Sequence, residues 1–104
     1  MVAERAMEIK SVENFVGEHP VSIVDCWAPW CTPCKTMLPV IDELAREMNV
    51  AFGKLNIDED QSVTSSYMVM SIPTLLIFKN GQLVDRITGN IPKSEIKRKI
   101  ETYI

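Results

Sequence analysis

The order of apolar segments in this chain of 104 residues predicts an α/β fold, in which one mixed sheet carries helices on both faces. In the first half, strand-like segments alternate with helix-like segments, as they do in parallel crossover units. In the second half, two strand-like segments follow one another closely and a helix closes the chain, which indicates a hairpin. Since 46% of the residues are hydrophobic, the chain can build one compact core, and residues 1–104 are expected to form a single domain.

The first half of the chain contains the predicted crossover units. Met7–Ile9 is a candidate first strand, and Ser11 is a candidate N-cap for a short helix that stops at Gly17. The run Val21–Trp27 is short, continuous and rich in β-branched residues, which is typical of a strand buried on both faces. Val50–Ile57 is the next predicted strand. Between these two strands, apolar residues recur at helical spacing: Met37, Leu38, Ile41, Leu44, Ala45 and Met48.

The second half contains the predicted hairpin and the closing helix. Gln61–Tyr67 has a weak helical pattern, and Thr74–Phe78 is a dense apolar strand. Asn80–Gly81 is a strong signal for a two-residue hairpin turn, so Leu83–Thr88 is expected to return beside the preceding strand. The last helix is expected to begin near Pro92. Its apolar face repeats every four residues, at Ile96, Ile100 and Ile104.

The charge pattern argues against several classes of partner. The formal net charge is -3 at pH 7, without any block of Lys and Arg, so nucleic acid is not an expected partner. No run approaches the roughly 18 apolar residues of a membrane span, and Met1–Met7 lacks the apolar segment of an export signal. We therefore expect a soluble, cytoplasmic monomer whose three cysteines do not form a disulfide scaffold.

Cys31 and Cys34 are the strongest sign of function, because a Cys-x-x-Cys motif between a strand and a helix is typical of a redox centre. At a helix start, unpaired N–H groups and the positive end of the helix dipole favour a thiolate, the reactive form of cysteine. Cys31 at the N-cap should be accessible, with Cys34 one turn inside, so we assign Cys31 as the nucleophile and Cys34 as the resolving thiol. Pro33 has no N–H group and should stiffen this first turn.

A metal site is the alternative function for these cysteines. A Cys-x-x-Cys pair can be half of a zinc site, but the sequence contains no second pair. Cys26, Cys31 and Cys34 together match the spacing of the first three ligands of a plant-type iron–sulfur ferredoxin. A fourth cysteine is absent and Cys26 lies within an apolar run, so we expect Cys26 to be an inert core residue and no metal to be bound.

Asp25 is a carboxyl group in a segment that should be buried. Burial would raise its pKa toward neutrality, which suits a proton acceptor for Cys34. A strand-end Asp that accepts hydrogen bonds from backbone N–H groups explains the pattern equally well, and the sequence leaves both interpretations open. Lys54 would supply a compensating charge if it points inward, although the pattern is more typical of a surface lysine. His19 lies in a predicted loop and is expected to be a solvated surface residue.

Trp30 and Pro73 are further candidates near the cysteines. A core position for Trp30 is one interpretation, but two tryptophans so close to a reactive thiol indicate that one of them lies at the surface as a docking ring. Pro73 stands directly before a strong strand, where proline is tolerated only at the start or edge. Since most X-Pro bonds in folded proteins are trans, the residues alone give no reason to predict a cis bond.

Four blocks of sequence, in order, resemble the thioredoxin family, and the likeness spans essentially the whole chain. The blocks are Val24–Ala28, Trp30–Lys35, Lys54–Asp58 and Ile72–Gly81. The resemblance implies a thioredoxin fold, with a central five-stranded mixed sheet flanked by four helices, and a cis peptide bond between Ile72 and Pro73 that faces the disulfide. It also implies a substrate-binding surface near the cysteines, made of Trp30, Thr32, Pro33, Ile72, Pro73 and Gly89.

The same resemblance implies a general protein disulfide reductase without a bound cofactor. Cys31 would attack oxidised protein substrates, Cys34 would release them, and a separate thioredoxin-reductase-like donor would regenerate the dithiol. Asp25 would be the buried acid and Lys54 its partner. Two alternatives stay open. One is a disulfide oxidant or isomerase, although those relatives usually carry His at the position of Pro33, and the other is a redox-inactive binding module with the same fold.

Three departures from the family pattern lie around the expected site. Thr32 stands where the family usually has Gly, and a β-branched hydroxyl residue between the sulfurs is expected to affect the reduction potential. Cys26 occupies the usual Phe position. Met70–Ser71 replaces Arg-Gly or a similar pair, and Met68 replaces a frequent Gly, which changes the lip of the expected groove. The choice of partners is therefore less well predicted than the activity.

Overall fold

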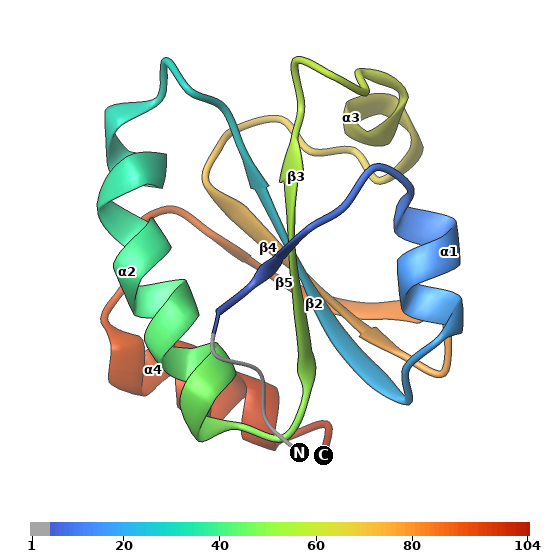
Figure 1. Ribbon diagram of the computed structural model, residues 1–104, viewed down its shortest axis with the longest axis vertical. Coiled ribbons are helices and arrows are strands. Elements are labelled where there is room, and N and C mark those ends of the chain that lie inside the picture. Colours follow the sequence, from blue (N-terminus) through green and yellow to red (C-terminus); the bar gives the residue numbers. More distant parts are fainter. Residues whose placement is uncertain (1–4) are drawn as a thin grey trace.

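The computed structural model describes residues 5–104, whose strands form one mixed sheet in the order β1-β3-β2-β4-β5 (Figure 1). The elements are β1 (Met7–Glu8), α1 (Val12–Gly17), β2 (Val21–Trp27), α2 (Thr32–Glu47), β3 (Ala51–Asn56), α3 (Ser62–Ser66), β4 (Thr74–Lys79), β5 (Gln82–Thr88) and α4 (Lys93–Glu101). β1, β3 and β2 run parallel, whereas β4 pairs antiparallel with both β2 and β5. The predicted fold class is confirmed. Met1–Glu4, on which part of the export-signal argument rests, lie outside the described residues.

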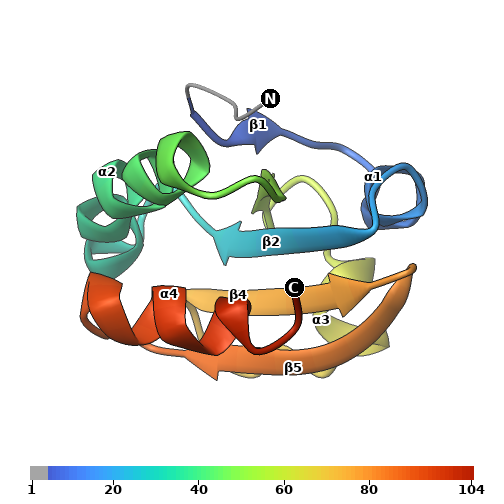
Figure 2. The ribbon, with the colours of Figure 1, turned by 90° about the horizontal axis from the view of Figure 1, so that it is seen from below.

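Helices cover both faces of the sheet, as the sequence predicts. α2 and α4 lie on one face, and α1 and α3 lie on the other (Figure 2). Because side chains alternate along a strand, Ile23 of β2 joins the core beneath α2 and α4, while Val24 and Cys26 join the core beneath α1 and α3. β2 is therefore buried on both faces, which explains its almost continuous apolar sequence. No helix within residues 5–104 is long and apolar enough to cross a membrane.

Two local sequence signals have the predicted structural effect. The side chain of Ser11 accepts a hydrogen bond from the N–H group of Asn14 at 3.2 Å, so Ser11 is the N-cap of α1. Asn80 and Gly81 have φ values of 51° and 82°, and two left-handed residues in succession are what a tight two-residue hairpin between β4 and β5 requires.

The predicted apolar stripe of the last helix is wrong at its end. α4 ends at Glu101, so Ile96 and Ile100 are fully buried whereas Ile104 is 67% exposed. Since Ile104 follows the helix, the four-residue spacing no longer places it on the same face. Tyr103, which is half-buried, packs against this part of the core instead.

Other differences between prediction and structure are smaller. His19 is half-buried rather than solvated, and its ring packs against Phe15 with the ring centroids 5.2 Å apart. Leu38, predicted on the apolar face of α2, is only half-buried. The weak helix predicted over Gln61–Tyr67 is confirmed, but it is the shorter α3.

Candidate functional site

The loop between β2 and α2 carries the cysteine pair. Cys31 is the N-cap residue of α2, with an extended backbone (φ -94°, ψ 103°). Its N–H group donates to the carbonyl of Ala28 at 3.1 Å, and its Sγ atom accepts a hydrogen bond from the N–H group of Cys34 at 3.3 Å. A sulfur atom thus occupies the place that a Ser or Asp oxygen takes at other helix starts, where free N–H groups and the helix dipole stabilise negative charge.

Cys31 and Cys34 are joined by a disulfide, and their Cα atoms are 5.3 Å apart. Cys31 is 6% exposed and Cys34 is fully buried, so a substrate sulfur can approach only the first. Thr32 and Pro33, between them, are exposed in the first turn of α2. The more exposed of the two is Cys31, as the N-cap position predicts, but Cys31 is itself buried in the disulfide form rather than freely accessible.

Asp25 lies in β2 on the same face as Ile23, two residues earlier, and therefore on the face that α2 covers. The side chain is 1% exposed, and neither carboxyl oxygen has a hydrogen-bond partner among residues 5–104. The alternative of a carboxylate held by backbone N–H groups is therefore wrong. Burial raises the pKa of Asp25 to about 7, with Lys54 acting to lower it and Asp42 acting to raise it.

Lys54 is the residue of β3 that pairs with Asp25 in the parallel register of β2 and β3. Paired residues of neighbouring strands project from the same face of a sheet, so Lys54 accompanies Asp25 on the α2 face. Lys54 is half-buried. Its exposure thus lies between that of a lysine pointing inward and that of a surface lysine, the two possibilities that the sequence left open. The charge of Lys54 lowers the pKa of Asp25.

Cys26 is fully buried and belongs to the core beneath α1 and α3, on the opposite face from Asp25. Burial, together with the nearby charge of Asp25, raises the pKa of its thiol to about 12, so Cys26 carries almost no thiolate at neutral pH. In the part of the chain that the structure describes, no three His, Cys, Asp or Glu residues are grouped so as to hold a metal ion.

Trp30 lies at the surface beside the cysteine pair, as predicted. Its side chain is 66% exposed, and the indole N–H group donates to both carboxylate oxygens of Asp58, at 3.1 and 3.2 Å. The hydrogen bond to a charged acceptor fixes the orientation of the ring without burying it. An apolar ring thus stands exposed next to Cys31.

The loop before β4 faces the same cysteine. The peptide bond between Ile72 and Pro73 is cis, as the family resemblance implies, and the Ile72 carbonyl oxygen lies 3.9 Å from Cys31 Sγ. The N–H group of Gly89, just after β5, donates to the Pro73 carbonyl at 2.9 Å. Three stretches that are distant in sequence therefore meet at Cys31.

A model of the thioredoxin family matches residues 6–102. The chain belongs to the thioredoxin family. The family resemblance that the sequence blocks indicate is therefore confirmed, and the thioredoxin fold with it.

Individual thioredoxins are similar to the chain over most of its length. It is 44% identical over 110 residues to "Thioredoxin M-type, chloroplastic" from Spinacia oleracea, which covers 98% of this chain but only 61% of that protein. It is 47% identical over 90 residues to a thioredoxin from Synechocystis, covering 85% of this chain and 83% of the relative. A mutant thioredoxin from Halobacterium salinarum has a similar structure, with a TM-score of 0.93 at 28% identity, covering 99% of this chain and 94% of that one.

Some residues of this thioredoxin site were not predicted. Asp58 follows β3, and since β2 and β3 are parallel, their carboxyl ends meet at the edge that also carries Trp30. Ile57 packs against the cysteine pair for the same reason. With the order of the strands known, the Lys54–Asp58 block would have placed both Ile57 and Asp58 beside the cysteine loop. Arg86 of β5 donates to backbone carbonyls near the site, and an arginine in an alternating strand gives no sequence signal for that.

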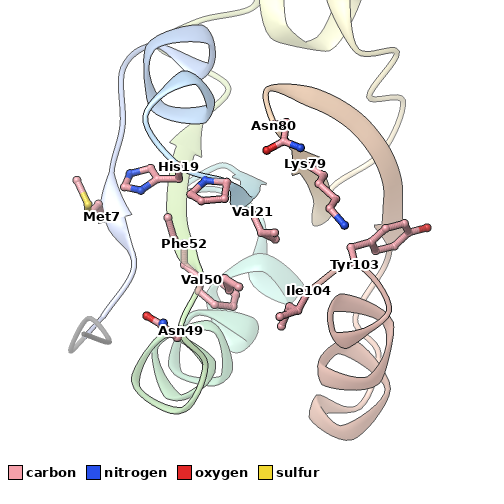
Figure 3. A pocket seen from close by; sticks show the side chains of 12 residues that line it. Met7, His19, Val21, Asn49, Val50, Phe52, Lys79, Asn80, Tyr103 and Ile104 are labelled. Atoms are coloured by element: carbon pink, nitrogen blue, oxygen red, sulfur yellow. The ribbon is translucent and has the colours of Figure 1, made fainter.

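A pocket of about 550 Å³ opens at the end of the sheet where β2 and β3 begin (Figure 3). The disulfide lies at the other end, because the cysteine loop follows the end of β2. The lining of the pocket comes from the starts of β2 and β3, the end of β4 and the last residues of the chain, and includes Val21, Phe52, Lys79, Tyr103 and Ile104. No residue of the cysteine site lines it. At the cysteine site, by contrast, the exposed residues are Trp30, Thr32 and Pro33, and Cys31 beside them is only 6% exposed.

Proposed function

We propose that this chain is a thiol–disulfide oxidoreductase that reduces the disulfides of oxidised proteins. The observation that carries the proposal is the cysteine pair at the start of α2, in which Cys31 is 6% exposed and Cys34 is fully buried. Membership of the thioredoxin family supports the same activity. The dithiol itself carries two electrons, so the reaction requires no bound cofactor.

In the proposed reaction, the thiolate of Cys31 attacks one sulfur of a substrate disulfide. A mixed disulfide forms, and the other substrate sulfur leaves as a thiolate that takes up a proton. Cys34 then gives up its proton and attacks Cys31 Sγ, which forms the Cys31–Cys34 disulfide and releases the second substrate thiolate. The substrate gains two electrons and the dithiol loses two, which a separate reductase restores.

Asp25 is the proposed acceptor of the proton that Cys34 gives up. It lies on the face of β2 that α2 covers, and β2 leads directly into the loop that carries the cysteines. A pKa of about 7 allows this carboxyl group to take up or release a proton near neutral pH. Lys54 lowers that pKa and so favours the charged form, which is the form that can accept the proton.

The proposed substrate-binding surface surrounds Cys31. Trp30 offers an exposed apolar ring, and the cis-proline loop places a backbone carbonyl 3.9 Å from Cys31 Sγ. Hydrogen bonds to neighbouring elements hold both Trp30 and the cis-proline loop, so the binding surface is preorganised. The residues that we assign to this surface are Trp30, Thr32, Pro33, Ile72, Pro73 and Gly89.

The proposed partners follow from this chemistry. They are oxidised proteins as substrates and a thioredoxin-reductase-like donor, with residues 1–104 acting as a single-domain monomer. For its location we propose the cytoplasm, because a dithiol of this kind functions where thiols are kept reduced. The spinach relative is named chloroplastic, so fractionation of the source cells, with an antibody to this chain, tests the choice.

The reduction potential of the Cys31/Cys34 pair tests the proposed direction of the reaction. The protein is equilibrated in graded thiol buffers, and alkylated cysteines are counted by mass. A value near or below about -250 mV supports a reductase, and a value above roughly -180 mV overturns it in favour of an oxidant or isomerase. A Cys31→Ser/Cys34→Ser variant is the control. If wild-type protein shows no turnover, and the double variant binds the partners as well as wild type does, the chain is a binding module.

A further inference from the structure

Residues 67–73, here called the rim loop, connect α3 to β4 (Figure 1). The loop ends at the cis-proline Pro73, next to Ile72, whose carbonyl oxygen lies 3.9 Å from Cys31 Sγ. Met68 has a φ of 52°, a left-handed conformation that a side chain makes unfavourable. Val69 is buried, whereas Met68 is 70% exposed and Met70 is 91% exposed. The loop thus presents two large apolar side chains to solvent from a backbone that is not in its preferred conformation.

Arg86 holds the beginning of the rim loop. Its Nη2 atom donates to the Tyr67 carbonyl at 2.7 Å and its Nη1 atom donates to the Met68 carbonyl at 3.1 Å. Arg86 pairs with Leu76 across β4 and β5, and Leu76 faces the core beneath α1 and α3, so the arginine side chain projects on the face where the rim loop starts. Two charge-assisted hydrogen bonds from one planar group fix the direction of both carbonyls.

Gly89, just after β5, holds the other end of the rim loop. The N–H group of Gly89, which follows Arg86 by three residues, donates to the Pro73 carbonyl at 2.9 Å. The hydroxyl of Thr74, the first residue of β4, donates to the Ser71 carbonyl at 2.6 Å. Ile72, whose carbonyl oxygen lies 3.9 Å from Cys31 Sγ, stands between these attachments. Of the attachments described here, those of Arg86 are the ones that a side-chain substitution on β5 can remove.

We propose that Arg86 is a positioning residue for disulfide exchange: by holding the Tyr67 and Met68 carbonyls, it fixes the rim loop in the place where a protein substrate binds. The inference rests on the proposed function, because it concerns the same site. Arg86 bonds to the loop backbone and not to the reacting sulfurs. Its removal should therefore weaken the binding of a protein disulfide and leave the chemistry of the cysteine pair unchanged.

The test compares Arg86→Ala with wild type in single-turnover reactions of pre-reduced protein. The substrates are oxidised insulin, a protein disulfide, and 5,5′-dithiobis(2-nitrobenzoic acid), a small disulfide that has no need of the rim loop. Loss of hydrogen bonds from a charged donor leads us to expect an approximately fivefold higher half-saturating concentration of insulin. The maximal rate, the rate with the small disulfide and the reduction potential should stay as in wild type.

Three further variants separate positioning from a general effect on stability. Arg86→Lys keeps the charge but cannot donate from a planar fork to two carbonyls, so it should show an intermediate loss. It also serves if Arg86→Ala does not fold. Met68→Gly makes the left-handed turn favourable without help, so Arg86→Ala in that background should have a smaller effect than in wild type. Arg98→Ala, on the exposed side of α4, is the control for the loss of one positive charge.

The possible outcomes are distinct. A lower melting temperature of Arg86→Ala with unchanged insulin kinetics would overturn the inference, and so would equal slowing with both disulfides. An equal effect of Arg86→Ala with and without Met68→Gly would also count against it. If wild-type protein reduces neither disulfide, the proposed function fails, and that result is independent of any Arg86 variant.

Discussion

Replacing Asp25 by Asn should change how the stability of the oxidised protein depends on pH. Burial raises the pKa of Asp25 from 3.8 to about 7. The unfolded chain therefore releases this proton near pH 4, while the folded protein holds it up to about pH 7. Between these values the folded state binds more protons than the unfolded state, so the free energy of unfolding falls as the pH rises.

The size of the effect follows from the same two values. A pKa that moves from 3.8 to about 7 corresponds to about 4 kcal/mol, at about 1.4 kcal/mol for each pH unit. Relative to wild type, Asp25→Asn should gain stability progressively from pH 4 to pH 7 and keep a constant advantage of about 4 kcal/mol above that. Because Lys54 lowers the pKa of Asp25, that pKa should be higher in Lys54→Gln than in wild type. The free energy of unfolding of Lys54→Gln should therefore go on falling to a higher pH than that of wild type.

The assay is urea-induced unfolding of the oxidised forms between pH 4 and pH 9, in which the disulfide-bonded cysteines do not titrate. Glu101→Gln, at an exposed position of α4, is a matched control for the loss of one carboxyl group. A difference between Asp25→Asn and wild type that is the same at every pH would refute the reasoning. It would mean that Asp25 is already charged in the folded protein at pH 5.

Three other predictions concern the cysteines and the core. Cys34→Ser should accumulate a mixed disulfide between Cys31 and a protein substrate, detected by mass, and a variant that turns over normally would contradict the assignment of the resolving thiol. Alkylation of the reduced, folded protein should label Cys31 but spare Cys26, which is fully buried with a pKa of about 12; labelling of Cys26 without denaturant would show that the core opens. Gly53→Ala should destabilise the protein by about 1 to 3 kcal/mol in urea unfolding, because the new Cβ would lie 3.0 Å from side-chain atoms of Ile9 and Phe15, and unchanged stability would mean that these two side chains move apart freely.

The strands and most of the helices could be predicted because their signals are local. The predicted ends of the strand Val21–Trp27 are those of β2, because a strand buried on both faces needs a continuous apolar run, and this run ends where the cysteine loop begins. The turn at Asn80–Gly81 follows from the few residues that adopt left-handed conformations. The end of α4 could not be predicted, because Ile104 keeps the helical spacing although the helix ends at Glu101.

The candidate site was predictable only as far as its chemistry is contained in a short motif. The Cys-x-x-Cys spacing after a strand places Cys31 at a helix start without knowledge of the rest of the fold. The environment of Asp25 depends on what lies across the sheet and above it, and a run of apolar letters does not reveal whether backbone N–H groups reach its oxygens. The cis bond before Pro73 likewise came from the family resemblance and not from the residues themselves.

The disulfide closes a ring of only a few residues, since Cys31 and Cys34 are three positions apart. A covalent link stabilises a fold mainly by shortening the reach of the unfolded chain, and a loop this small contributes about 2 kcal/mol in that way, against nearly 5 for a loop of about 100 residues. Most of the stability of the molecule therefore resides in the two cores on either side of the sheet, which contain neither of these sulfurs. Breaking or forming the disulfide should therefore leave both cores intact and change the structure only at the start of α2.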